Sequence, residues 1–251
     1  MNAYRSSSEL KGMAKEQLFG RYGTVIGATL LTALSALLSV RVCAAFAAPL
    51  LASAGMVYFT ALYLLSGIVL LFLGILESGS AYLYLKLSCH QPISVSDIFY
   101  GFRLYPGKAL ALQSLVILLT IICNAPQQVM AYLYRASYYN TIYLLLFAVA
   151  SIAGYVLLII GWLMLSQVFY LLQDFPHYST RELIKTSCRI MRGHKGRLFY
   201  ITVSFIPLYF LAFLSFGLGL LWITPYKKTV MANFYMNLMY SRPGQRADRV
   251  G

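Results

Sequence analysis

Two acidic residues are the side chains of this sequence most able to do chemistry inside an apolar environment. Glu77 ends one long run without Asp, Glu, Lys or Arg, and Asp174 ends another that covers residues 136–173. If Lys86 marks the membrane surface, Glu77 lies about 14 Å inside the bilayer, at about 1.5 Å per helical residue. A carboxylate at that depth needs a polar partner or a cavity. The candidate partners of Glu77 are Gln113, Lys227 and Lys228.

Two placements of Glu77 remain open on the sequence alone. If its helix starts earlier than expected, Glu77 touches the lipid head groups, since helix tilt and boundaries vary. If it does not, Glu77 is the leading candidate for a functional polar site within the membrane. Asp174 is expected at the interface instead, because Pro176 stops the helix soon after it.

The sequence carries no motif that indicates catalysis or metal binding. His90, His177 and His194 are isolated, and the adjacent pair Cys89-His90 lacks the spacing of a structural zinc site, which needs four ligands. A Gly-rich phosphate loop, a Gly-x-Ser-x-Gly motif and a His-Glu-x-x-His motif are all missing. We therefore expect no enzymatic activity, no metal ion and no cofactor.

The composition indicates an all-α membrane protein. The chain is 60% hydrophobic and 11% charged, whereas soluble domains are about 45–50% apolar and about 25% charged. Uncharged runs cover residues 22–40, 42–76, 109–134, 136–173 and 198–226. Each reaches or nearly reaches the roughly 20 residues that cross a bilayer, and none alternates as the strands of a membrane barrel do. We expect one polytopic transmembrane helix bundle over residues 1–251.

The distribution of Lys and Arg predicts six spans. Five spans are expected at 22–40, 57–77, 109–131, 143–165 and 198–220. A turn at Ser215–Gly219 would return a sixth helix over 219–240, with both termini cytoplasmic. Basic residues stay preferentially on the cytoplasmic side, and six spans place eighteen of the twenty Lys and Arg there, against thirteen for five spans. Lys227 and Lys228 then lie partway along the last helix, unless the last helix pair is a re-entrant hairpin.

A basic amphipathic helix is predicted before the fifth span. Ser179 and Glu182 have the spacing of a capping box, and Gly193 is a natural helix stop. The apolar face comprises Leu183, Ile184, Ser187, Cys188 and Met191. The basic residues are Arg181, Lys185, Arg189 and Arg192 on the opposite face, followed by Lys195 and Arg197. We expect this helix at the membrane surface, where its charges either contact anionic lipid head groups or act only as a topology signal. The net charge of +13 then needs no nucleic-acid partner.

The same order of elements is expected three times along the chain. A short amphipathic helix, a glycine-basic corner and a pair of spans would occupy residues 8–77, 94–165 and 179–240. Ser96 is the expected cap of the middle surface helix. Asn124–Gln128 is expected to end the third span as a loop, with the lining of a polar cavity as the alternative. A three-fold repeat would fit the internal repeats of membrane transporters. Any helix that enters from the cytoplasm needs such a corner, so the pattern has a simpler explanation as well.

Several motifs resemble a family of bacterial polytopic membrane proteins catalogued as domain of unknown function 975. The first is a helix end with Met191, Gly193 and Lys195, followed by Leu198 and Phe199. The second is a signature formed by Gly217, Gly219, Leu221, Trp222, Pro225 and Tyr226. Where the family usually has Gly-Trp, this chain has Pro207-Leu208, and a kink of the fifth span is expected there. The resemblance implies an integral protein of the bacterial plasma membrane, without an established activity or active site to transfer.

Two classes of function remain. The first is a non-enzymatic membrane protein that moves a small or amphiphilic molecule, or assists a partner that does. The second is an envelope scaffold or regulator without a permeation path. Polar residues that face a cavity between the spans would favour the first class, and a purely apolar bundle would favour the second. The sequence identifies no substrate, protein partner or oligomeric state.

Overall fold

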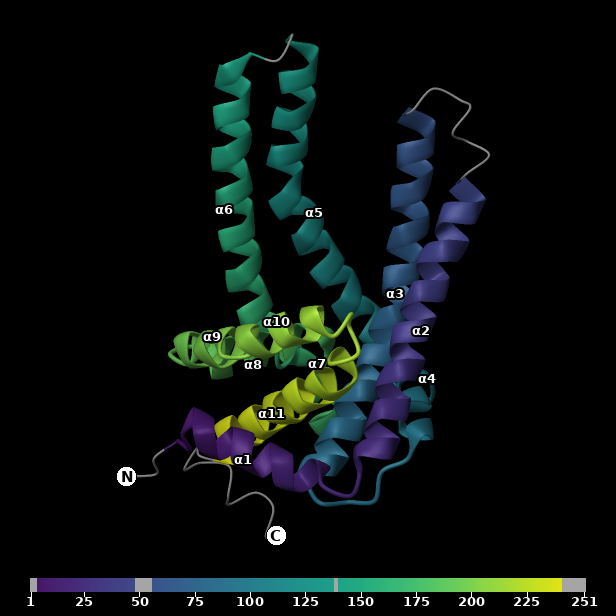
Figure 1. Cartoon of the computed structure of the whole chain (residues 1–251), viewed down its shortest axis with the longest axis vertical. Coiled ribbons are helices and arrows are strands. Elements are labelled where there is room, and N and C mark those ends of the chain that lie inside the picture. Colours follow the sequence, from purple (N-terminus) through teal and green to yellow (C-terminus); the bar gives the residue numbers. More distant parts are fainter. Residues whose placement is uncertain (1–3, 48–55, 138–139, 241–251) are drawn as a thin grey trace.

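The fold is built of helices throughout the part of the chain that the structure, a computed structural model, describes: residues 4–47, 56–137 and 140–240. In chain order the elements are α1 (Ser7–Leu18), α2 (Tyr22–Ala47), α3 (Met56–Ser88), the 3₁₀-helix η2 (Val95–Phe99), α4 (Tyr100–Arg103), α5 (Pro106–Ala136), α6 (Thr141–Leu165), α7 (Val168–Asp174), α8 (Thr180–Met191), α9 (Lys195–Val203), α10 (Ile206–Leu214) and α11 (Leu220–Tyr240). Figure 1 shows two upright hairpins, α2 with α3 and α5 with α6, above a base formed by the shorter helices and α11. The predicted all-α class is confirmed.

Four described helical segments are long and apolar enough to cross a membrane. They are Gly67–Ser88, Pro106–Tyr134, Thr141–Asp174 and Lys195–Leu214. A fifth exists if α1 and the part of α2 over Tyr22–Leu38, which meet at a bend of 99°, count as one span. The predicted sixth span, 219–240, forms α11 but is not among these segments. By length and composition the described residues support four or five spans, and the count of six is not confirmed.

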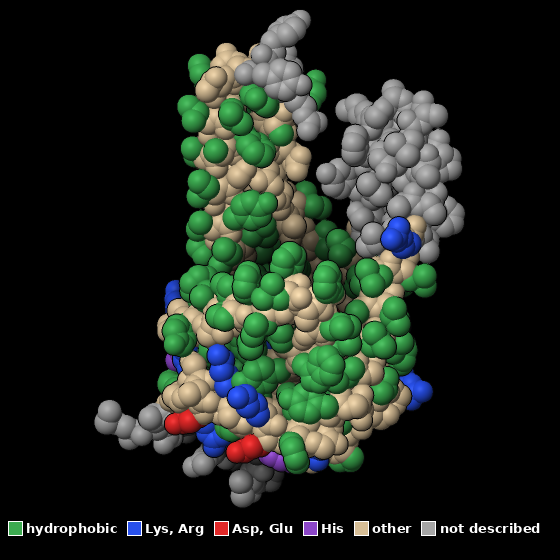
Figure 2. Space-filling model, viewed as in Figure 1, with side chains coloured by type: hydrophobic (Ala, Val, Ile, Leu, Met, Phe, Trp, Pro, Cys, Tyr) green, Lys and Arg blue, Asp and Glu red, His purple; other side chains and the backbone are tan. Residues whose placement is uncertain are grey.

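α9 and α10 differ from the other candidate spans in direction. In Figure 1 they run across the lower ends of α5 and α6, which stand upright. The helix breaks between Val203 and Ile206, beside the kink expected at Pro207, because proline is best tolerated in the first turn of the new helix. Phe210, Phe213 and Phe216 along α10 and the following turn are exposed, and Figure 2 shows hydrophobic side chains across this level of the molecule. An apolar surface of this extent needs a covering of lipid or protein.

The α5–α6 hairpin is apolar outside and closely packed inside. Leu145, Val149 and Ile152 on α6 are between 63% and 67% exposed. Along the inner seam, a Cβ on Gly154 would overlap the carbonyl oxygen of Cys123. Small residues at a helix seam are typical of packing within a membrane, where close backbone approach replaces hydrophobic burial as the source of attraction.

The core of the molecule lies in the base, and α11 passes through it. Every side chain from Thr229 to Tyr235 is buried. Asn233 Nδ2 donates a 2.9 Å hydrogen bond to Gln17 Oε1, and both side chains are buried. Gln17 Nε2 in turn donates to the Ser88 carbonyl oxygen at 3.3 Å. The bond between the two amides fixes the register of α11 against α1, and the second bond joins Gln17 to the end of α3.

Two glycines let the η2–α4 segment pack directly against the backbone of α3. A Cβ on Gly79 would overlap the carbonyl oxygen of Ile98, and a Cβ on Gly101 would overlap the carbonyl oxygen of Ile75. Lys86 and Asp97 close the same contact with a 3.0 Å ion pair. The contact places Lys86, the expected marker of the membrane surface, beside the short helices of the base.

Two predicted helix boundaries are wrong. Ser94, rather than Ser96, caps η2, because Asp97 stands three residues after Ser94 and completes a capping box. Asn124–Gln128 does not end a span, since α5 continues to Ala136 with Pro126 inside it. The turn expected at Ser215–Gly219 is confirmed, with Phe216 and Gly217 at φ values of 52° and 87°.

Candidate functional site

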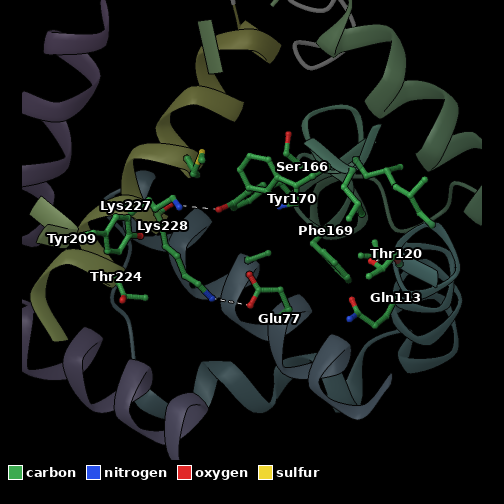
Figure 3. Close-up of a pocket in the computed structure, with 17 residues that line it drawn as sticks. Glu77, Gln113, Thr120, Ser166, Phe169, Tyr170, Tyr209, Thr224, Lys227 and Lys228 are labelled. Atoms are coloured by element: carbon green, nitrogen blue, oxygen red, sulfur yellow. Dashed lines mark hydrogen bonds and ion pairs between the residues drawn. The ribbon is translucent and has the colours of Figure 1, made fainter. Parts of the chain in front are cut away.

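A cavity of about 440 Å³ lies where α3, α5, α6, α7, α10 and α11 meet (Figure 3). Its apolar wall includes Val116, Leu119, Leu158, Trp162, Leu165 and Phe169. Its polar groups come from Glu77, Gln113, Thr120, Ser166, Tyr170, Tyr209, Thr224, Lys227 and Lys228. The volume falls within the range of roughly 300–1,000 Å³ that is usual for small-molecule sites.

Glu77 and Lys228 form an ion pair in this cavity. Lys228 Nζ donates to Glu77 Oε2 at 2.8 Å and so joins α11 to α3, two helices far apart in the sequence. The Glu77 side chain is 51% exposed and that of Lys228 is 25% exposed. In Figure 3 the Glu77 carboxylate projects into the space enclosed by the lining residues. The pair therefore compensates both charges and still leaves the carboxylate accessible to a molecule in the cavity.

Lys227 is held differently from its neighbour. Its Nζ lies over the ring of Tyr209, 5.3 Å from the ring centroid, an arrangement in which the negative face of the ring attracts the ammonium group. Neither of the described ion pairs Lys86–Asp97 and Lys228–Glu77 includes Lys227, and Glu77, the carboxylate that lines the cavity, is paired with Lys228. The described lining of the cavity therefore carries one positive charge in excess.

α11 presents both lysines because it continues through Pro225. Two hydrogen bonds from side chains stabilise the stretch of α11 that follows Pro225. Thr229 Oγ1 donates to the Pro225 carbonyl oxygen at 2.8 Å, and Tyr170 Oη donates to the Lys228 carbonyl oxygen at 3.4 Å. These bonds come from α11 itself and from α7. They keep the lysine-bearing turn in place beside α3.

The structure brings together four of the five residues proposed as an intramembrane polar site. Glu77, Gln113, Lys227 and Lys228 all line the cavity, and Gln113 does so where α5 passes closest to Gly74 of α3. Asp174 lies elsewhere, at the end of α7, where its Oδ2 accepts a 3.0 Å hydrogen bond from Tyr235 Oη. Asp174 therefore belongs to the packing of the base. A functional role for the other four stays a prediction.

The hydroxyl groups of the cavity were not predicted. They belong to Thr120, Ser166, Tyr170, Tyr209 and Thr224. Single hydroxyl residues are common in apolar helices because they bond to a backbone carbonyl one turn earlier, as Thr120 Oγ1 does to Val116 at 2.9 Å. No spacing along the chain marks these five residues. Four of them lie on α5, α7, α10 and α11, and Ser166 lies between α6 and α7, so they meet only in the folded molecule.

The basic helix α8 begins at the predicted cap, but its apolar face meets protein. The backbone N–H and hydroxyl of Ser179 donate to the Glu182 carboxylate and hold the pKa of Glu182 below its ordinary value. Leu183 and Met191 are buried, and Ser187 Oγ donates a 2.7 Å hydrogen bond to the Met164 carbonyl oxygen. The face expected to rest on lipid thus packs against the bundle. Arg181, Lys185, Arg189 and Arg192 are exposed, and their contact with lipid stays a prediction.

Arg197 does not belong to the exposed basic surface that was predicted for it. Its guanidinium donates to the carbonyl oxygen of Arg5 and, at 3.0 Å, to Asn237 Oδ1. It also lies over the ring of Phe234 at 5.3 Å. Arg197 therefore connects α9 with α11 and the segment before α1. Lys195, the first residue of α9, is half-buried.

The residues of the two family motifs lie at helix ends and in contacts between helices. Met191 is buried and Gly193, at a φ of 85°, follows the end of α8. Gly219 N–H donates to Ser215 Oγ at 3.0 Å within the turn before α11. The Tyr226 ring packs 5.3 Å from the ring of Phe205, whereas Trp222 is exposed. None of these residues lines the cavity, so the motifs describe the scaffold around it.

The arrangement suits binding better than catalysis. In the described ranges no three His, Cys, Asp or Glu side chains gather so that they could hold a metal ion. One paired carboxylate and two ammonium groups provide no nucleophile with an adjacent base. Charged groups on one side and an aromatic and aliphatic wall on the other match an amphiphilic molecule. The lack of enzymatic activity, metal and cofactor stays a prediction.

Comparison with protein families gives one match. The model of the family described as Protein of unknown function (DUF975) matches residues 1–242. No curated protein and no solved structure matches the chain. The matched range includes every described helix and every residue of the cavity.

Proposed function

The chain belongs to the family of uncharacterised proteins described as DUF975, and we propose that it is a non-enzymatic, multi-pass protein of the bacterial plasma membrane. Its proposed activity is to bind a small or amphiphilic molecule and to move it, or to assist a partner that does. The observation that carries the proposal is the Glu77–Lys228 ion pair in a cavity with an apolar wall. A charged pair at membrane depth is costly, and such pairs typically mark substrate or ion pathways.

The accessibility of Glu77 supports binding over a purely structural role. A structural ion pair is most effective when both groups are enclosed and fully hydrogen-bonded, whereas about half of the Glu77 side chain is exposed, at 51%. A scaffold or regulator without a permeation path is the alternative function. Such a protein needs no polar cavity between its helices, and the polar lining therefore favours binding.

The proposed topology has both termini in the cytoplasm and the basic face of α8 on the inner leaflet. In Figure 2 most of the visible Lys and Arg side chains gather on the lower part of the molecule, around the base. Arg181, Lys185, Arg189 and Arg192 are exposed there for contact with anionic lipid head groups. The last helix pair either completes a sixth span or enters the membrane as a re-entrant hairpin. The direction of α9 and α10 in Figure 1 supports the hairpin.

Reporter fusions test this topology. Fusions after Gly251 and near residue 90 are expected to behave as cytoplasmic, and fusions near Arg41 and Arg135 as external, because eighteen of twenty basic residues then lie inside. A fusion after Gly251 that reads as external, together with a cytoplasmic one near residue 90, would contradict the proposed position of the tail.

Quenching of Trp162 tests binding in the cavity. In a Trp222→Phe background Trp162 is the remaining tryptophan, and it lies in the cavity wall. We expect at least one of three brominated amphiphiles of equal chain length, with anionic, zwitterionic or cationic head groups, to quench it saturably in nanodiscs. A second variant, Leu158→Phe, narrows the cavity without adding a tryptophan. It should weaken the quenching if the probe binds in the cavity. Quenching that rises linearly for all three probes, as with lipid, would refute the proposed site.

A further inference from the structure

A polar stripe runs along one face of α5 and has no part in the site described so far beyond its lower end. Gln113, Thr120, Asn124 and Gln127 follow one another at intervals of seven, four and three residues. At about 100° per residue these positions fall within roughly 60° of one another around the helix. The stripe therefore forms a narrow line, and apart from Ser114 the other residues of α5 between its two ends are apolar. Over fourteen residues it rises about 21 Å, a large part of a hydrocarbon core of roughly 30 Å.

The stripe is continuous with the cavity. Gln113 and Thr120 line the cavity, and the upper two residues continue from them by hydrogen bonds. Asn124 Nδ2 donates to the Thr120 carbonyl oxygen at 2.7 Å, and Gln127 Nε2 donates to Asn124 Oδ1. The hydrogen-bonded series from Thr120 to Gln127 thus extends upward from the cavity, starting about two helical turns above Gln113.

The stripe borders the space between α5 and α3 and avoids the seam between α5 and α6. The seam contains Cys123, which is buried against Gly154, and Leu119, which contacts Gly161. Gln113, at the lower end of the stripe, meets Gly74 of α3. Above this contact α5 and α3 diverge (Figure 1). Thr120 is exposed, and Asn124 and Gln127 are half-buried.

A line of amides facing lipid tails would be unfavourable without a purpose, because polar groups at membrane depth usually face protein or a water-filled space. The charges in the cavity, where the stripe begins, indicate which molecules the stripe suits. Lys228 is compensated by Glu77, and Lys227 adds a positive charge that no described carboxylate balances. An anionic group is therefore favoured in the cavity, on the side of Lys227.

We propose that the α5 polar stripe is the route by which the anionic head group of an amphiphile passes between the cavity and the far side of the membrane. The apolar tail remains among the lipid tails in the widening space between α3 and α5. The head group moves from the lysines to Gln113 and Thr120 and then along Asn124 and Gln127. This inference rests on the proposed function, because it assigns a ligand class and a path to the same cavity.

The test measures transfer in vesicles containing the full-length protein. Trace phosphatidylglycerol with a fluorescent label on its head group is placed in both leaflets of phosphatidylcholine vesicles, and an impermeant reductant is added outside. The label of inner-leaflet lipid is lost only as the lipid crosses. A second arm uses an unlabelled fatty acid and a pH dye inside the vesicles. The protonated acid that crosses on its own acidifies the interior, whereas a carboxylate that crosses takes up protons there and raises the internal pH. The two arms separate a phospholipid from a free fatty acid as the source of the anionic head group.

The triple variant Thr120→Val, Asn124→Leu, Gln127→Leu is expected to slow transfer at least tenfold in the arm that the wild type accelerates. The matched control, Ser114→Ala with Ser151→Ala, removes two hydroxyls that lie off the stripe and should transfer at the wild-type rate. Asn124→Asp keeps the stripe polar but adds a like charge. It should slow the anionic probe and leave a cationic head-group probe unaffected.

The outcomes separate this inference from the proposed function. If the triple variant keeps saturable quenching of Trp162 and also keeps full transfer, the stripe is no route, and the cavity remains a binding site. Wild-type protein that binds the probe but does not accelerate either arm overturns the route as well. If the wild type neither binds nor transfers any probe, the proposed function itself fails. Dimers that sediment only when the stripe is intact would assign the stripe to self-association and overturn the route.

Discussion

Replacing Lys228 by Met is expected to lower the free energy of unfolding by about 2 kcal/mol. The substitution keeps the length of the side chain but removes the ammonium group that Glu77 Oε2 accepts from at 2.8 Å. The carboxylate is then left on a membrane helix without a cationic partner. We discount the larger cost of a fully enclosed pair, because 51% of the Glu77 side chain is exposed. The measurement is a denaturant titration of the protein in nanodiscs, which gives the unfolding midpoint and the free energy of unfolding.

A double-mutant cycle isolates the pair itself. Glu77→Gln should also destabilise the protein, and adding it to Lys228→Met should recover at least half of the loss, since no unpaired carboxylate remains. The comparison variant is Asp174→Asn, whose amide oxygen can still accept the hydrogen bond from Tyr235. It should cost less than Glu77→Gln. Strictly additive effects of the two cavity substitutions would show that the ion pair contributes nothing to stability.

Replacing Gly79 by Ala is expected to cost about 3 kcal/mol, the upper part of the usual range for an overpacked core. The new methyl group would overlap the carbonyl oxygen of Ile98, a backbone atom that cannot rotate away. The η2–α4 segment must then lift from α3, which weakens the Lys86–Asp97 pair. Loss of thermal stability and faster trypsin cleavage at the exposed Arg103 measure the two consequences.

Gly67→Ala is the matched control for this prediction. Gly67 lies on the same helix, and nothing stands within 4 Å of a Cβ built on it. Alanine also has a higher helix propensity than glycine, by about 1 kcal/mol, so this variant should be unchanged or stabilised. Equal stability of the two variants would mean that η2 adjusts freely and that close backbone contact is unimportant here.

The polar cluster of the cavity was partly predictable because isolated charges are rare in apolar sequences. Glu77 stands out as an acid at the end of a long uncharged run, and Lys227 and Lys228 interrupt an expected span. The cost of burying charge then predicts that such residues meet, as Glu77 and Lys228 do. Asp174 carries a similar signal in the sequence, yet it bonds to Tyr235 in the base. Charge pattern alone does not tell which helix a side chain will face.

Of the two predicted helix caps, Ser179 is confirmed and Ser96 is wrong, because the capping box of η2 joins Ser94 to Asp97. The Ser179–Glu182 capping box holds because both of its hydrogen bonds are local. Pro126 and the polar residues beside it suggested a loop, but a membrane environment favours a continuous helix over exposed backbone groups. The apolar face of α8 correctly predicted a helix, but this face packs against the helix bundle and not against lipid as expected. An amphipathic pattern does not distinguish a lipid surface from the side of a helix bundle.

The number of spans was the least predictable feature. Counting Lys and Arg assigns loops to sides of a membrane, but it contains no information about the direction of a helix. α9 and α10 are apolar enough to cross and yet lie across the ends of α5 and α6. Packing of Leu198, Ile201 and Phe205 into the core of the base sets this direction. Such long-range packing is not encoded in the hydropathy of the segment.

The buried hydrogen bond between Gln17 and Asn233 joins two helices that are synthesised at different times. α1 leaves the ribosome before its partner α11, because the two bonded side chains are 216 positions apart in the chain. At roughly 5–20 residues per second, synthesis of that interval lasts on the order of 10–40 s. During this time Leu10, Ala14 and Leu18, which are buried in the finished molecule, have no α11 to cover them. This face of α1 must therefore be shielded until α11 has been synthesised.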